Sequence, residues 1–314
     1  MIPGSANPLL LAADAAAGGY SIARSLRFNS ADSAYLSRTP ASAGNRKTWT
    51  WAGWVKKVKT GDSVASIFSA GSAGISNYDG FIFGGNNVDT FAIGFANAAG
   101  NSNDYLFETT QVFRDPSAWY HIIVALDTTQ STASNRLKIY INGVEVTSIS
   151  GGLPTQNYQT NWINTASLHS IGTAAGIYFG SRLLNAYLAD IHFIDGQALT
   201  PTSFGEFDAT TGVWNPKAYT GTYGTNGFHL DFADNSNNTA TTLGKDSAGS
   251  NNWTPNNISV TAGAGNDSLV DSPVNGSASS GADPGGSIVG NYCTWNTLAK
   301  TSSVIVSNGN LDAV

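Results

Sequence analysis

The sequence predicts an all-β sandwich followed by a long irregular C-terminal extension. Short apolar runs recur between turn residues before residue 200, and no segment there sustains the 3.6-residue period of a helix. Only 11 % of the 314 residues are charged, and 35 are glycine. Soluble domains average roughly 25 % charged residues, and solvent-facing helices usually carry Glu and Lys. A surface of Ser, Thr, Asn and Gly therefore favours strands and loops.

The expected strands begin near the N-terminus and follow one another at short intervals. "SLRFN" (25–29) and "AYLSR" (34–38) flank a turn, and "TWTWAGWVKKV" (48–58) alternates Thr and Trp before it runs into lysines. The next four runs are "SVASIFSAG", "DGFIFGG", "DTFAIGFAN" and "DYLFETT", and two later ones are "SLHSIGT" and "NAYLADIHFIDGQAL". Many short strands with frequent turn signals are typical of a β-sandwich.

A hairpin in the middle of the chain is the clearest local signal. In "RLKIYI" (136–141) every second residue is apolar, which is the period of a half-buried strand. Asn142 and Gly143 then supply the positive φ angles of a type I′ turn, and "VEVTSI" (144–149) is expected to return antiparallel. We therefore expect Gly143 at positive φ and no helix over residues 137–149.

Only one short helix is predicted. Thr200 is a candidate N-cap, and Pro201 stands at the first helical position of "TPTSFGEF" (200–207). After about residue 232 the chain becomes rich in Gly, Ser, Asn and Thr, with little to bury. Residues 206–290 are accordingly expected to be a loop-rich extension or linker.

The two ends of the chain carry apolar residues outside the expected sandwich. Residues 1–19 contain "PLLLAADAAA", and we interpret them as an anchoring arm in which Leu9, Leu10 and Leu11 are buried against another chain. Residues 291–314 form a tail with the strand-like "SSVIVS". We expect the strand at 304–306 to pair with the sandwich or with a partner.

Four blocks of the sequence resemble the laminin-G-like, concanavalin-A-like jelly-roll domain. In order they are "SLRFNSADSAYLSRT", "KTWTWAGWVK", "WYHIIVALDTT…RLKIYINGVEV" and "YLADIHFIDGQALTPTSF". The resemblance implies a jelly-roll sandwich over residues 20–205. It implies function only weakly, because this fold serves lectins, glycosidases and structural modules.

A further block resembles a segment common in proteins of tailed bacteriophages, especially marine ones. It begins "FGEFDATTGVWNPKAY" and ends "SLVDSPVNG". In those proteins the segment often precedes a β domain of SPRY type, and the present chain stops near where such a domain would begin. This resemblance implies a virion protein.

Catalytic chemistry is not indicated by the sequence. Glycosidases of this fold place two carboxylates on one strand, about 5–5.5 Å apart for a retaining mechanism. Of the three glutamates, only Glu206 has a second carboxylate within two positions, at Asp208. We expect this pair to face water at a helix end and not to be catalytic. The single cysteine, Cys293, excludes an internal disulfide and has no nucleophile motif around it.

Metal sites are weakly supported. The histidines are scattered and form no H-x-x-x-H or Cys/His cluster, so zinc is not expected at His121, His169, His192 or His229. His121 and His192 lie in strand-like runs, where packing or hydrogen bonding is the expected role. Calcium is the one cofactor considered, at Asp234 in "DNSNN" and Asp267 in "GAGNDS". Neither motif completes a known calcium loop, and solvated turns are favoured for both.

Three aromatic residues in polar loops are candidates for sugar binding: Tyr78 in "ISNYDG", Trp162 in "YQTNWINT" and Trp253 in "SNNWTPNN". Exposed aromatic rings beside amide side chains stack on sugar rings and bind their hydroxyls. The alternative for each is a loop aromatic that folds back over its own sandwich. Trp54 and Trp119 occupy strand patterns and are expected in the core.

The favoured hypothesis is a non-enzymatic structural virion protein of a tailed bacteriophage, either a tail fibre or adhesin component or a capsid-surface decoration. It would be assembled in the bacterial cytoplasm with other virion proteins and copies of itself, as a homotrimer or larger, and would contact host glycans. A free lectin-like carbohydrate-binding module is the alternative, and a glycan hydrolase is the least favoured. A net charge of −6 argues against nucleic-acid binding. No stretch reaches the ~18 apolar residues of a membrane span.

Overall fold

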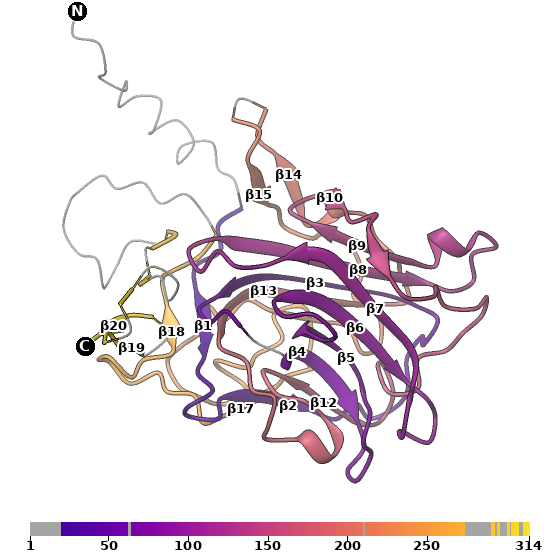
Figure 1. The fold of residues 1–314 in the computed structure, drawn as a ribbon, viewed down its shortest axis with the longest axis horizontal. Coiled ribbons are helices and arrows are strands. Elements are labelled where there is room, and N and C mark those ends of the chain that lie inside the picture. Colours follow the sequence, from indigo (N-terminus) through magenta and orange to yellow (C-terminus); the bar gives the residue numbers. More distant parts are fainter. Residues whose placement is uncertain are drawn as a thin grey trace, which may run out of the picture.

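Two antiparallel sheets pack face to face in the computed structural model (Figure 1). The structure describes residues 20–61, 64–209, 211–273, 290–292, 294–295, 300–301, 303–307 and 310–314. Within these residues there is no α-helix, so the all-β sandwich is confirmed. The predicted anchoring residues Leu9, Leu10 and Leu11, and also Cys293, lie outside the described residues.

Sheet A has eight strands. Across the sheet they are β10 (Val144–Glu145), β9 (Leu137–Ile141), β8 (Trp119–Asp127), β3 (Thr48–Lys57), β13 (Ala186–Asp195), β1 (Ser25–Phe28) and β18 (Ser268–Leu269), with β16 (Phe228–Leu230) also paired to β13.

Sheet B also has eight strands. In order they are β11 (Ile149–Ser150), β7 (Asn103–Val112), β6 (Thr90–Ala96), β5 (Asp79–Gly84), β4 (Val64–Gly71), β12 (Leu168–Ile171), β2 (Tyr35–Arg38) and β17 (Thr254–Asn256). Two small hairpins complete the described strands: β14 (Gly205–Phe207) with β15 (Trp214–Pro216), and β19 (Val306–Ser307) with β20 (Asp312–Ala313). The described helices are single 3₁₀ turns, namely η1 (Ala133–Asn135), η2 (Gly176–Tyr178) and η3 (Pro201–Ser203). None of them is long or apolar enough to cross a membrane.

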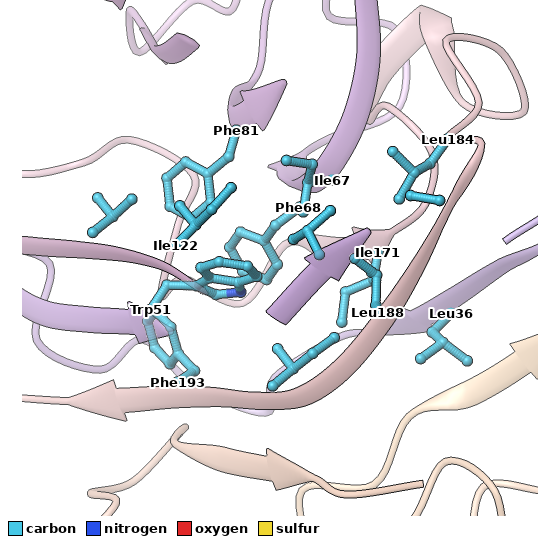
Figure 2. Packing of buried hydrophobic residues seen from close by; sticks show 14 of the residues in the cluster. Leu36, Trp51, Ile67, Phe68, Phe81, Ile122, Ile171, Leu184, Leu188 and Phe193 are labelled. Atoms are coloured by element: carbon cyan, nitrogen blue, oxygen red, sulfur yellow. The ribbon is translucent and has the colours of Figure 1, made fainter. Parts of the chain in front are cut away.

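An aromatic core joins the two sheets. Trp51 of sheet A packs against Phe81 of sheet B with ring centroids 5.6 Å apart, and Phe68 stacks on Phe81 at 5.5 Å (Figure 2). All three rings are at most 1 % exposed. Because full burial of a large apolar side chain contributes about 1.5–3 kcal/mol, this cluster is a major source of stability.

The central hairpin is confirmed. Asn142 and Gly143 have φ angles of 48° and 80°, and Val144 pairs with Ile141 across the turn. The returning strand differs from the prediction, because it leaves sheet A after two residues and continues as β11 in sheet B. The chain thus passes from one sheet to the other at this edge of the sandwich.

The predicted helix over residues 200–207 is wrong in extent. The 3₁₀ turn η3 follows Thr200, whose side chain makes no cap hydrogen bond. Residues 205–207 then form β14, which pairs with β15 instead of continuing a helix. Backbone pairing within this hairpin replaces the helical bonds that the pattern predicted.

The extension after residue 205 is not a linker. Three of its segments join the sheets: β16 pairs with β13, β17 with β2 and β18 with β1. Three of its large apolar residues, Leu230, Leu243 and Trp253, are fully buried in the main core. In the described part of the extension, the composition shift therefore reflects short strands, three of which pair with the sandwich, separated by loops.

The two C-terminal strands form a hairpin with each other. β19 pairs with β20, and the Ile305 N–H donates to the Val314 carbonyl at 2.7 Å. Of the two pairings expected for residues 304–306, the one with the sandwich is therefore wrong, and the one with a partner chain stays a prediction. The tail is held nearby through Lys56, whose Nζ donates to Asp271 Oδ2 at 2.8 Å and to Asn291 Oδ1 at 3.0 Å.

Candidate functional site

The outer face of sheet B bears a small hollow that we regard as the candidate site. Phe81 on β5 and Ile93 and Phe95 on β6 belong to the core. Residues that alternate with them along the strands, such as Gly80, Ile82 and Gly94, lie on the outer side. On this outer side Gly80 pairs with Gly94, which in turn pairs with Leu106 on β7. The hollow measures about 60 Å³. It is lined by Asn77, Tyr78, Gly80, Ile82, Gly94, Asn103, Leu106 and Arg182.

Arg182 forms one wall of the hollow. Its guanidinium lies 3.5 Å from the ring centroid of Tyr178 and 5.8 Å from that of Tyr78. One nitrogen donates to the Tyr78 hydroxyl at 3.4 Å. The backbone of Arg182 is in the left-handed region with φ of 51°, and its carbonyl accepts the Ser66 N–H at 2.9 Å. The loop thus holds this cation against two aromatic rings at the edge of the sheet.

Tyr78 lies at the hollow, but as a supporting wall and not as an open platform. Its side chain is buried, and burial raises the pKa of its hydroxyl, so that it remains a neutral phenol that accepts from Arg182. Tyr178, which the sequence analysis did not single out, meets it edge-on at 6.5 Å. The segment "GIYFGSR" (176–182) could have indicated Tyr178 and Arg182, because it places aromatic residues and an arginine in a loop flanked by glycines.

Trp162 lies at the same end of sheet B. Its backbone N–H donates to Asp79 Oδ2 at 2.7 Å, and Asp79 directly follows Tyr78. Its indole Nε1 donates to the Asn97 carbonyl at 3.3 Å. In the loop that begins at Asn97, the Gly100 carbonyl accepts the Asn77 N–H at 2.8 Å. The structure therefore brings Tyr78 and half-buried Trp162 to one loop cluster beside the hollow.

Trp253 corrects the prediction of an exposed sugar-binding ring. It is fully buried and packs against Phe228 at 4.9 Å and Phe68 at 6.3 Å. The backbone N–H of Trp253 donates to the Gly244 carbonyl, so the polar loop folds back and inserts the ring into the core. A sugar cannot reach this side chain, and the alternative of a loop aromatic packed on its own sandwich holds here.

The outer face of sheet A is different, because the extension covers it. A β-bulge at Asp190 separates the part of β13 that pairs with β1 from the part that pairs with β16. Asp190 takes a φ of 51° there. It accepts from the Tyr20 hydroxyl at 2.7 Å and bonds to His229 Nε2 at 2.7 Å, and His192 Nε2 lies 3.3 Å away. Sequence reasoning missed this cluster because His192 and His229 meet only through strand pairing.

The cluster combines two imidazoles and one carboxylate, a donor set that also binds zinc. The two imidazoles stack with centroids 4.1 Å apart and planes 13° from parallel. Both Nε2 atoms face the Asp190 carboxylate, at 2.7 Å from His229 and 3.3 Å from His192. We interpret the cluster as a hydrogen-bonded network, in which His192 also bonds the Tyr223 hydroxyl at 2.9 Å.

The charges of the network follow from its burial. Burial lowers the pKa of His192 and keeps its ring neutral, despite the nearby Asp190 charge. Burial alone would raise the pKa of Asp190, but the two imidazole partners outweigh it and hold that pKa well below its usual range. Burial also lowers the pKa of His121 to about 3, and its Nδ1 accepts from Trp214 Nε1 at 3.0 Å. The predicted packed roles of His121 and His192 are confirmed.

The family of the chain is decided by residues 29–203, which match the profile of the concanavalin A-like lectin/glucanases superfamily. The chain belongs to this family. The resemblance seen in the four sequence blocks is thereby confirmed at the level of the domain. No curated protein matches the chain.

Several solved structures are similar to this concanavalin A-like chain. A putative carbohydrate binding protein from Bacteroides ovatus has a TM-score of 0.47 and 16 % identity, covering 76 % of this chain and 59 % of that chain. The heptameric SAP-like pentraxin from Limulus polyphemus gives 0.41 and 16 %, covering 58 % and 80 %. Domains LG4-5 of the mouse laminin α1 chain give 0.38 and 11 %, covering 57 % and 44 %. These likenesses concern the fold alone.

The carboxylate pair considered for catalysis has no shared geometry in this concanavalin A-like domain. Glu206 is exposed on β14, with its carboxylate 3.6 Å from Lys217 Nζ. Asp208 accepts from the N–H and the hydroxyl of Thr211 within its own turn. The pair lies on a surface hairpin and not at the helix end that the sequence predicted.

The two calcium candidates have different surroundings. Asp234 is exposed, and its Oδ1 accepts from the N–H and hydroxyl of Ser236, as expected for a solvated turn. Asp267 is buried and forms an ion pair with Arg27 at 2.8 Å, and its second oxygen accepts the Ser259 N–H at 2.7 Å. The expectation of a solvated turn at Asp267 is therefore wrong, because the extension packs this carboxylate against β1.

Proposed function

We propose that the chain is a non-enzymatic glycan-binding module whose binding surface is the outer face of sheet B. The observation that carries the proposal is the hollow beside Tyr78 and Arg182 on a face that the extension leaves uncovered. Sugars present both hydroxyl groups and apolar ring faces, so their sites combine aromatic walls with a few polar groups. Asn77 and Asn103 supply amide groups at the rim.

The floor of the hollow suits close approach of a flat ring. Gly80 and Gly94 face each other across β5 and β6, so no side chain rises between the walls. A Cβ atom at Gly94 would meet nothing closer than 3.9 Å, whereas one at Gly80 would come within 2.7 Å of the Phe68 carbonyl. Gly94 is therefore the position at which the hollow can be filled without disturbing the sheet.

A glycan array with Gly94→Val tests the proposal. We expect the wild-type protein to bind a subset of glycans and the variant to lose that binding with its melting temperature retained. Gly152→Val is the matched control, since a Cβ atom there would meet nothing within 4 Å and the residue lies outside the hollow. Binding that survives Gly94→Val, or no binding by the wild type to any glycan, would contradict the proposal.

We further propose that the module is part of a tailed-bacteriophage virion, as a tail fibre or adhesin component or a capsid-surface decoration. The hairpin β14–β15 projects from the sandwich (Figure 1) and leaves Phe207 and Val213 52 % and 45 % exposed. Exposed apolar side chains on a projecting element favour packing against another chain, either another virion protein or a copy in a homotrimer.

Assembly and location test this second proposal. We expect sedimentation to report a trimer or larger, and immunogold labelling to find the protein on virus particles. Deletion of residues 1–19 is expected to preserve the sandwich by circular dichroism but to abolish assembly. A truncated protein that assembles normally would contradict the anchoring-arm idea and favour the free lectin-like module.

A further inference from the structure

We infer that the ligand of the sheet B hollow is an acidic glycan, in which a sugar carboxylate binds Arg182. This inference rests on the proposed glycan-binding function and names the substrate class of the same site. Three features carry it: an unpaired cation, a fixed orientation of that cation, and a hollow whose other lining residues are neutral.

Among the described residues, the fully buried cations are paired with carboxylates, whereas Arg182 is not. Arg27, Lys56 and Lys57 are buried, and each forms an ion pair with an aspartate at 2.7–2.8 Å. Within the part of the chain that the structure describes, no carboxylate forms an ion pair with Arg182. A guanidinium carries five N–H donors, and here one of them reaches a phenol hydroxyl. Several donors of a half-buried cation are left to bind an incoming group.

The guanidinium is held in place before any ligand arrives. Its stacking on Tyr178 at 3.5 Å and its bond to Tyr78 fix the plane of the group. The backbone of Arg182 is left-handed, a conformation that glycine adopts more readily than arginine, and its side chain lines the hollow. A fixed planar guanidinium matches the two oxygens of a carboxylate, which is the geometry of bidentate recognition.

Two buried carboxylates of the neighbouring strands are already engaged. Asp79 is buried, and its oxygens accept the N–H groups of Ala96, Trp162 and Ile163. Glu108, also buried, accepts from the Thr90 hydroxyl and the Asn87 N–H. Neither acid lines the hollow, so the cation there is not neutralised by the protein.

The test compares acidic polysaccharides with their carboxyl-reduced forms, which keep the same backbone and linkage but carry a hydroxymethyl group instead of the carboxylate. Oligogalacturonides and their reduced galactose counterparts form the first pair, and the array supplies further pairs. We expect the wild-type protein to bind the acidic member of a recognised pair at least about tenfold more tightly, and less so at high salt.

Arg182→Gln is the decisive variant, with Arg114→Gln as its control. Arg114 is exposed and lies outside the hollow, so its loss changes the net charge equally. We expect Arg182→Gln to abolish the acid preference, Arg114→Gln to retain it, and Arg182→Lys to retain part of it, with unchanged melting temperatures. Should Arg182→Gln unfold the protein, Tyr78→Phe replaces it, since that change removes only the hydroxyl that positions the guanidinium.

The outcomes separate this inference from the function on which it rests. Equal binding of acidic and reduced forms by the wild type, lost in Gly94→Val, would overturn the inference and leave the glycan-binding proposal intact. An acid preference that persists in Arg182→Gln would also overturn the inference. No binding of any glycan would overturn the proposed function and the inference together.

Discussion

The outer faces of the two sheets differ, because the extension covers that of sheet A and leaves a hollow on that of sheet B. The outer face of sheet A is covered by residues 197–230, which bury Phe204 and Trp214 against it. The outer face of sheet B keeps paired glycines and a hollow rimmed by Tyr78 and Arg182. The covered face contributes burial to the fold, and the open face is the one on which we propose that a ligand binds.

The covered face has a polar centre, which explains why it needs the extension. His121 stacks on Trp54 at 4.6 Å and accepts from Trp214, and Asp190 bonds to Tyr20 and His229. Buried polar groups are costly unless they are hydrogen-bonded. The extension supplies two of those partners, Trp214 and His229.

The largest expected effect belongs to the extension's contribution to the core. Trp253→Ala is expected to lower the free energy of unfolding by about 3–5 kcal/mol, because it leaves a cavity between Phe68 and Phe228. Chemical denaturation measures the change. Trp295→Ala is the matched control, since Trp295 is 57 % exposed and its loss should change little. Equal effects of the two changes would refute the assignment of the extension to the core.

The second largest effect on the free energy of unfolding is expected from acidification, which acts on the covered face through His121. The pKa of His121 is about 3 in the folded chain, below the usual 6.5. Between these two values the unfolded chain binds a proton at His121 and the folded chain does not. The free energy of unfolding should therefore fall by about 1.4 kcal/mol per pH unit between about pH 6.5 and about pH 4 through this residue. Asp79 acts in the opposite sense, since burial raises its pKa to about 7.

The difference between wild type and His121→Asn isolates this contribution. The asparagine keeps an acceptor for Trp214 Nε1 but does not titrate. We expect the pH dependence of stability, measured by urea unfolding, to become flatter on acidification by about 1.4 kcal/mol per pH unit in the variant. Parallel curves would show that His121 is protonated in the folded state.

A smaller loss is expected when the charge at the centre of the covered face is removed. Asp190→Asn fits the same left-handed backbone but weakens the bonds from Tyr20 and His229, at a cost of about 2 kcal/mol. Asp234→Asn is the control in an exposed turn.

Thermal melts with a chelator and with zinc test whether this cluster binds a metal. A hydrogen-bonded network predicts no shift of the melting temperature in either condition. Stabilisation by zinc would instead identify a metal centre.

The smallest effect on stability is expected at the hollow. Gly94→Val adds a β-branched side chain to a strand where a new Cβ atom has space, so the free energy of unfolding should change by less than about 0.5 kcal/mol. Thermal denaturation of the variant measures this change. A large loss would show that the face of sheet B is also a stability element.

Local pattern was enough to predict much of the fold. The strands of residues 25–195 have alternating or continuous apolar runs, and the Asn142-Gly143 step identifies its turn without tertiary information. The extension escaped prediction because β16, β17 and β18 are two or three residues long, too short for any period. Trp253 looked like a loop residue for the same reason.

The candidate site was predicted only in part. Tyr78 and Trp162 were found from their polar neighbours, and both lie beside the hollow. Arg182 was missed because its role depends on a left-handed backbone and on stacking against Tyr178, and neither is visible in a linear pattern. The pairing of His192 with His229 likewise depends on strand order across sheet A.

The pairing of β18 with β1 and of β17 with β2 has a consequence for synthesis. Leu26 pairs with Ser268, and Leu36 pairs with Pro255, so the first strands to leave the ribosome receive their outer neighbours last. Until then each early strand presents an unpaired backbone edge, which is the surface on which β proteins aggregate. Such late, distant closure slows folding. A nascent chain stalled before residue 255 is therefore expected to depend on chaperones in a way that the finished molecule does not.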